Sequence, residues 1–124
     1  MSFENRMNKV LNQLTSENLD GAYITNLTNV RYLTGFTGSA GSVLILNEEQ
    51  HFFTDGRYIE QSKEQVKNCK IHIVGSAHFL AIAKENIVCD GENIGFESDF
   101  VSVNLFAHFK ESLPKIHWVK TSEI

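Results

Sequence analysis

The stretch that decides the fold reads Asn29-Val30-Arg31-Tyr32-Leu33-Thr34-Gly35-Phe36-Thr37-Gly38-Ser39-Ala40-Gly41-Ser42-Val43-Leu44-Ile45-Leu46. Its first part carries apolar residues at helical spacing and predicts a short helix ending near Phe36. A glycine-rich loop, residues 35–42, separates this helix from an apolar run, residues 43–46, which predicts a strand. A polar turn follows, and residues 51–54 predict the returning strand of a hairpin.

Helix and strand patterns alternate on both sides of this hairpin. The apolar residues of the N-terminal segment recur at helical period and predict a first helix, with Ser2 as its N-cap. Other predicted helices and strands are the helices 57–66, 78–87 and 102–112 and the strands 22–24, 70–74, 93–96 and 116–119. Alternation of this kind implies an α/β domain, and the hairpin makes its sheet mixed. We therefore expect one three-layer α/β/α domain over residues 1–124, with five or six strands.

Composition excludes several classes of function. Of 124 residues, 42% are hydrophobic, and the net charge is −4 with the 11 basic residues scattered. A nucleic-acid-binding protein needs a clustered positive face, so neither nucleic acid nor an anionic membrane surface is an expected partner. No apolar run is long enough to span a bilayer, and no signal peptide is evident. A cytoplasmic location is the expectation that remains.

No constellation of residues predicts a catalytic or metal site in this chain. The five His residues include no pair three to five apart, and no His-Glu-x-x-His motif is present. Gly35, Gly38 and Gly41 precede a strand, whereas phosphate-binding loops precede a helix. Ser39 lacks the spacing of a nucleophile elbow. The two cysteines, residues 69 and 89, have no zinc or redox spacing, and we expect each to be a buried free thiol.

Three motifs, in this order, resemble one family. They are Asn29 to Ser39 as quoted above, Phe53-Thr54-Asp55-Gly56-Arg57-Tyr58 at the end of the hairpin, and Ile94-Gly95-Phe96-Glu97. Together they are similar to the N-terminal domain of the Xaa-Pro peptidases, the aminopeptidase P, prolidase and creatinase family. We interpret six residues as its structural motif, namely Arg31, Tyr32, Gly35, Asp55, Arg57 and Tyr58.

Four of these six residues have a simple physical interpretation. Tyr32, with Leu33 and Phe36, can pack the short helix against the sheet, and Gly35 permits the turn that follows. Asp55 can cap the helix that begins near Arg57, and Arg57 can pair with a neighbouring carboxylate.

The resemblance implies a larger protein. A catalytic domain of "pita-bread" shape would follow this one, and the end of the chain soon after its last predicted strand is typical of a domain boundary. That second domain would hold two divalent metal ions, often manganese, bound by two Asp, one His and two Glu, and would hydrolyse the peptide bond before proline. None of those ligands matches a position here, so the fragment alone is expected to be inactive and to carry no cofactor.

The resemblance also implies partners. The N-terminal domain would help to form a homodimer and would border the entrance to an active site that takes proline-containing peptides. The residues most suited to reach that entrance are Phe36, Thr37, Gly38 and Ser39, and we expect this loop to limit peptide length.

Two alternative functions remain open at this point. The parent protein could be a creatinase-like amidinohydrolase, because that enzyme shares the architecture without being a peptidase. The domain could also be a stand-alone module that binds a protein or peptide, because fold does not fix function. The sequence also leaves open the choice between dipeptidase and aminopeptidase.

Overall fold

A computed structural model describes residues 2–75 and 77–121 of the chain. Residues 1, 76 and 122–124, although inside the expected domain, lie outside the described residues. The strands are β1 Gly21–Ile24, β2 Ser42–Leu46, β3 Gln50–Thr54, β4 Lys70–Ile73, β5 Asn93–Glu97 and β6 His117–Thr121. The helices are α1 Phe3–Ser16, α2 Leu27–Thr34, α3 Ile59–Gln65, α4 His78–Lys84 and α5 Val103–Ser112, with a 3₁₀ turn η1 Gly56–Tyr58 before α3.

The sheet is mixed, as the hairpin predicts. Its six strands lie in the order β4-β3-β2-β1-β5-β6. Strand β2 runs antiparallel to both of its neighbours, whereas the β3–β4, β1–β5 and β5–β6 pairs are parallel. Five strands therefore end at one edge of the sheet, and β2 begins there. We call this the carboxyl edge.

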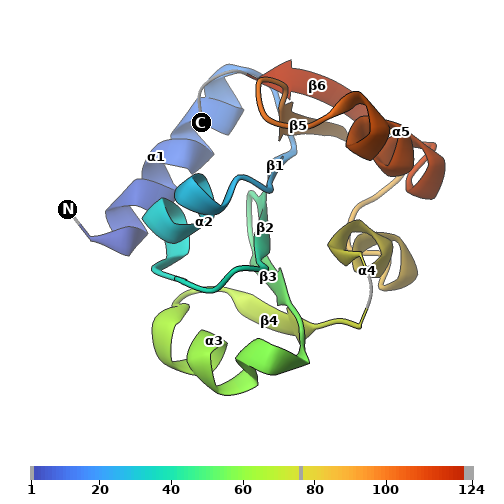
Figure 1. The fold of residues 1–124 in the computed structure, drawn as a ribbon. Helices are drawn as coiled ribbons and strands as arrows, with labels where there is room; N and C mark the ends of the chain where they lie inside the picture. The colour runs from blue at the N-terminus through green and yellow to red at the C-terminus, as the bar shows by residue number, and fades with distance from the viewer. Residues whose placement is uncertain (1, 76, 122–124) are drawn as a thin grey trace.

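Helices cover both faces of the sheet, so the predicted three-layer architecture is confirmed (Figure 1). Helices α1, α2 and α3 cover one face, while α4 and α5 cover the other. Strand β1 supplies both cores because successive side chains of a strand point to opposite faces. Ala22 and Ile24 pack under α1 and α2. Tyr23, which lies between them in the sequence, points to the opposite face and packs in the core under α4 and α5.

Local sequence signals fix the helix ends. Ser2 caps α1 as predicted, because its Oγ accepts a hydrogen bond from the Asn5 amide. Asn26 caps α2 in the same way, and Gly35 ends it in the left-handed conformation with φ of 84°. A side chain is disfavoured in that conformation, so glycine suits this helix end.

Three sequence predictions need correction. The segment predicted as one helix from residue 57 begins as the 3₁₀ turn η1, which Asp55 caps, and becomes α-helical only at Ile59. The helix predicted over residues 78–87 ends at Lys84. Cys89 is exposed and Cys69 half-buried, so the prediction of two buried thiols is wrong for Cys89.

Within the described part of the chain, no helix is long and apolar enough to cross a membrane.

Candidate functional site

Polar residues from distant parts of the chain meet at the carboxyl edge. Thr54 ends β3 and Asp55 follows it, while Glu97 ends β5 and Ser42 begins the antiparallel β2. The glycine-rich loop, residues 35–42, runs along this edge from α2 into β2. The loop and its neighbours form the candidate site.

Glu97 fixes the helix that carries the first motif. One carboxylate oxygen accepts hydrogen bonds from the amides of Thr25 and Asn26, at 2.7 and 2.8 Å, and the other accepts from Asn29 Nδ2 at 2.5 Å. A carboxylate at a helix N-terminus satisfies free amides and suits the helix dipole. Glu97 is 93% buried, since only 7% of it is exposed, and it thereby orients α2 and the loop that follows. The sequence pointed to Glu97 as part of a motif but gave it no role.

Phe36 lies in the core, so the expectation that it reaches a substrate entrance is wrong. Only 1% of this residue is exposed. Its ring makes edge contacts with Phe52, at 4.9 Å between centroids, and with Tyr58, at 5.3 Å. A Cβ on Gly38 would lie 2.3 Å from Phe36 Cζ, so glycine permits the loop to close over this ring. Of the four candidate residues, Thr37 and Ser39 are exposed and Gly38 is half-buried.

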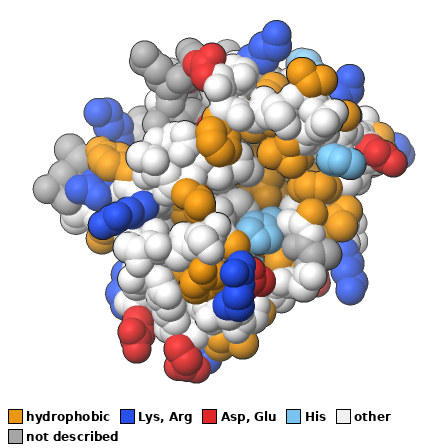
Figure 2. Space-filling view, in the orientation of Figure 1, with side chains coloured by type: hydrophobic (Ala, Val, Ile, Leu, Met, Phe, Trp, Pro, Cys, Tyr) orange, Lys and Arg blue, Asp and Glu red, His pale blue; other side chains and the backbone are white. Residues whose placement is uncertain are grey.

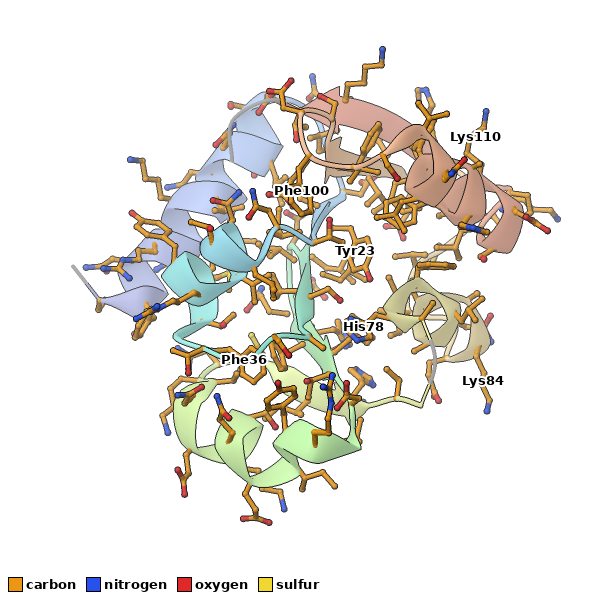
Figure 3. The ribbon with its side chains drawn as sticks, in the orientation of Figure 1. Tyr23, Phe36, His78, Lys84, Phe100 and Lys110 are labelled. Carbon is orange, nitrogen blue, oxygen red and sulfur yellow. The ribbon has the colours of Figure 1, made fainter. Side chains whose placement is uncertain are left out.

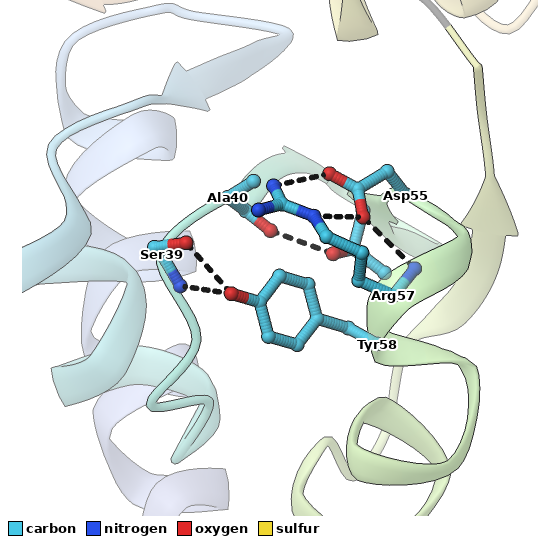
Figure 4. A network of polar contacts seen from close by, with 6 residues as sticks. Ser39, Ala40, Asp55, Arg57 and Tyr58 are labelled. Atoms are coloured by element: carbon cyan, nitrogen blue, oxygen red, sulfur yellow. Dashed lines mark hydrogen bonds and ion pairs between the residues drawn. The ribbon is translucent and has the colours of Figure 1, made fainter.

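The second motif braces the loop from outside (Figure 4). Tyr58 Oη lies 2.6 Å from Ser39 Oγ and accepts a hydrogen bond from the Ser39 amide at 3.1 Å. Thr54 Oγ1 donates to the Ala40 carbonyl at 2.6 Å. From α3, Gln65 Oε1 accepts from the Thr37 amide at 3.0 Å. The loop is therefore held at three successive points by side chains.

Asp55 and Arg57 form the local brace that the sequence predicts. Their side chains pair at 2.7 Å, and Asp55 Oδ1 also accepts from the Arg57 amide, which caps η1. The hydrogen bonds from Arg57 lower the pKa of the Asp55 carboxyl, and Asp55 raises that of the guanidinium. The hydrogen bonds from Ser39 lower the pKa of Tyr58. Because the ion pair is solvent-exposed, it contributes little to the stability of the fold. The Arg57 guanidinium also lies over the Tyr58 ring, 5.1 Å from its centroid.

Tyr32 and Arg31 lie on the surface, which corrects the interpretation of Tyr32 as a packing residue. Tyr32 is 48% exposed. The Arg6 guanidinium lies over its ring at 4.4 Å and donates to its carbonyl oxygen at 3.0 Å. These contacts join α1 to α2, whereas Leu33 and Phe36 make the predicted contact with the sheet.

The carboxyl edge thus presents a rigid, uncharged loop. Among residues 2–75 and 77–121, no three His, Cys, Asp or Glu side chains gather where they could hold a metal ion. The groups that fix the loop are hydroxyl and amide groups, which hold a shape but do not provide a general base at neutral pH. Sequence reasoning included Thr54 in the second motif without giving it a role, and it missed Gln65, because only the fold brings these side chains to the loop.

Comparison with known proteins agrees with this architecture. A family model described as "Creatinase/Prolidase N-terminal domain" matches residues 6–124. The "Uncharacterized peptidase YqhT" of Bacillus subtilis (strain 168) is 34% identical over 131 aligned positions, covering 95% of this chain. Among solved structures, the N-terminal domain of the cytoplasmic peptidase PepQ from Mycobacterium tuberculosis is 31% identical, with a TM-score of 0.85 over 95% of this chain and 93% of that one.

A third relative places the domain within a longer chain. The Xaa-Pro dipeptidase from Bacillus anthracis is 27% identical, with a TM-score of 0.88 over 98% of this chain but 34% of that one. Likewise, the match spans 37% of the Bacillus subtilis peptidase, so the chain covers little more than a third of either protein. The fold, the three ordered motifs and these matches show that the chain belongs to the creatinase/prolidase N-terminal domain family of the Xaa-Pro peptidases.

Proposed function

We propose that this chain is the non-catalytic N-terminal domain of a metal-dependent Xaa-Pro dipeptidase or aminopeptidase, which cleaves the peptide bond before proline. The observation that carries the proposal is the match of the whole domain to one third of a longer Xaa-Pro dipeptidase. A catalytic domain holding two divalent ions, manganese by our expectation, would supply the hydrolysis. The described residues of this chain offer no cluster for those ions.

In this proposal the domain borders the active-site entrance and contributes to a homodimer in the cytoplasm. The braced loop supports the entrance role. A loop that keeps its shape can block a long peptide, whereas a mobile loop would move aside. Thr37 and Ser39 are the residues whose exposure allows contact with a peptide. Phe36 contributes indirectly, because its ring supports the loop from below.

The test uses the longer protein and a bulky substitution. Thr37→Trp should lower kcat/KM for long proline-containing peptides more than for an Xaa-Pro dipeptide, because it narrows the space beside the loop. Asn47→Trp, in the exposed turn between β2 and β3, is the matched control and should leave both values unchanged. An equal effect on short and long peptides would remove the entrance role.

The same preparation tests the other parts of the proposal. Sedimentation should give a dimer, and removal of metal with a chelator followed by addition of Mn²⁺ should abolish and restore hydrolysis. Cleavage of creatine instead of Xaa-Pro peptides would establish the amidinohydrolase alternative and overturn the peptidase.

A further inference from the structure

A cleft of about 330 Å³ opens at the carboxyl edge, on the side of the sheet covered by α4 and α5. It lies where the chain leaves β1 toward α2 on one face and leaves β5 toward α5 on the other. In open α/β sheets such a divergence leaves a crevice beyond the strand ends, and ligands bind there. Its volume falls at the small end of the range for ligand pockets.

The floor of the cleft carries a chain of three hydrogen-bonded side chains. Tyr23 Oη lies 3.0 Å from Ser42 Oγ, and Ser42 Oγ lies 2.9 Å from His78 Nδ1. Figure 3 shows Tyr23 and His78 facing the space between α4 and the β1–α2 connection. In the same orientation, Figure 2 shows hydrophobic side chains around a histidine at the centre of this face.

Hydrogen-bond accounting fixes the direction of this chain. Tyr23 is 1% exposed, and within the described residues Ser42 is its only hydrogen-bond partner, so the Tyr23 hydroxyl must donate to Ser42. Ser42 is also buried, with 2% exposed, and within the described residues its hydroxyl proton has no acceptor other than His78 Nδ1 once Tyr23 donates to it. We therefore assign Ser42 as the donor and an unprotonated Nδ1 as the acceptor. A neutral imidazole with a bare Nδ1 carries its proton on Nε2. Burial lowers the pKa of His78, although Asp55 opposes this, so the ring is neutral at pH 7.

His78 Nε2 is therefore a fixed donor without a partner in the described structure. The cleft that His78 lines is largely apolar, since Leu27, Phe79, Leu105 and Phe109 also belong to its lining. No Lys, Arg, Asp or Glu belongs to the described lining. Such a cleft matches a ligand with one hydrogen-bond acceptor and an apolar group. Its lining supplies no countercharge to an ionic ligand, and Asp55, which acts electrostatically on His78, lies outside that lining.

We propose that this cleft binds an uncharged apolar segment of a peptide, whose backbone carbonyl accepts a hydrogen bond from His78 Nε2 and whose side chain enters the space beside Phe79 and Phe109. The site belongs to the 124-residue chain itself and goes beyond the proposed function, since it requires neither metal nor hydrolysis. Ser39 of the entrance loop belongs to the lining of the cleft but Thr37 does not, so the Thr37→Trp test of the entrance role is separate from the tests of this site.

Titration of the isotope-labelled chain with three small probes tests the proposal. N-acetyl-leucinamide is neutral, N-acetyl-leucine carries a carboxylate, and leucinamide carries an ammonium group. The neutral probe should shift the NMR signals of cleft residues such as Ala40 and Phe79 and bind more tightly than either ion. Equal or tighter binding of an ionic probe would overturn the ligand class, and the absence of shifts with the neutral probe would overturn the site.

Variants then test the hydrogen bond that His78 Nε2 donates to the ligand, which we call the anchor. His78→Phe keeps an aromatic ring beside Phe53, which His78 stacks against at 6.5 Å, but removes the donor. Affinity for the neutral probe should fall about fivefold, the usual effect of losing one hydrogen bond. His117→Phe, on β6 and away from the cleft, should leave affinity unchanged. Unchanged affinity in His78→Phe would overturn the anchor.

A measurement on the unaltered chain guards against a variant that fails to fold. Nitrogen NMR of the imidazoles distinguishes a protonated from a bare ring nitrogen. We expect a bare Nδ1 and a protonated Nε2 in His78 at pH 7, before any probe is added. A protonated Nδ1 would leave no donor facing the cleft and would overturn the proposal.

Discussion

At the scale of single residues, Glu97 links the ends of two motifs that lie about 70 positions apart. Its carboxylate accepts three hydrogen bonds, two of them from backbone amides at the start of α2. Loss of this acceptor would leave those amides without a protein partner in a part-buried position. Glu97 is thus a structural residue whose effect reaches the site through the position of α2.

Glu97→Ala should lower the free energy of unfolding by about 2–3 kcal/mol, because unsatisfied buried donors cost roughly that much. Urea denaturation of the variant and the parent chain measures the difference. Glu111→Ala, at an exposed position of α5, should change stability by less than about 0.5 kcal/mol. Equal effects of the two substitutions would contradict the role given to Glu97.

A second residue-scale feature is a pair of histidines at the β3–β4 boundary. His51 Nδ1 lies 2.9 Å from His72 Nε2, and His51 Nε2 lies 3.1 Å from Glu49 Oε2. Burial lowers the pKa of both rings, and for His72 the positive charge that His51 can carry lowers it further. The pair therefore favours its neutral form in the folded chain.

Stability should fall as the pH falls below the ordinary histidine pKa of 6.5. The folded pKa values lie below it, so the unfolded chain takes up protons first and is favoured. Denaturation at pH 7.5, 6.5 and 5.5 should give a decreasing free energy of unfolding. The His72→Phe variant should show a weaker decrease and His117→Gln the same decrease as the parent. A stability that rises toward pH 5.5 would contradict this account.

At the scale of elements, the glycine-rich loop and η1 behave as one unit. Tyr58 supplies both a ring that contacts Phe36 and a hydroxyl that holds Ser39. The loop therefore owes its fixed shape to a neighbouring element as well as to its own glycines.

Tyr58→Phe should loosen the loop without unfolding it, because the ring contact with Phe36 remains while the bonds to Ser39 are lost. Hydrogen exchange at the Ser39 amide should become faster, whereas exchange in β2 should stay the same. Tyr32→Phe is the matched control, since the Tyr32 hydroxyl bonds none of the described residues. Unchanged exchange at Ser39 would show that the brace is unnecessary.

Elements were also the level at which sequence reasoning worked best. Apolar periodicity predicted every strand and helix of the described chain, because core residues must follow the period of the element that buries them. It misplaced helix boundaries that depend on a local capping hydrogen bond, as at the 3₁₀ turn that Asp55 caps. The position of Tyr32 on the surface was missed, because the sequence does not show that its ring packs against Arg6 of α1 and not against the sheet.

The candidate site was less predictable than the fold. The motifs singled out the glycine-rich loop, but they did not show that Phe36, expected at the entrance, packs into the core. The pairing of His51 with His72 follows only from the parallel register of β3 and β4, which a single sequence does not reveal. Tyr23, Ser42 and His78 likewise meet only once the sheet order is known.

At the scale of the whole molecule, the domain is a complete layered unit with a core on each side of its sheet (Figure 1). In two relatives the matching region makes up about a third of a longer protein. We therefore propose support and shape as the role of this chain, and hydrolysis as the role of a domain outside it.

The most direct test of that assignment is the mass of the native protein, measured by immunoblot of its source cells with an antibody to this domain. We expect a band at ~40 kDa, the mass of a protein with two domains of ordinary length. A band at 14.0 kDa, the mass of this chain alone, would contradict the account and would favour a stand-alone binding module.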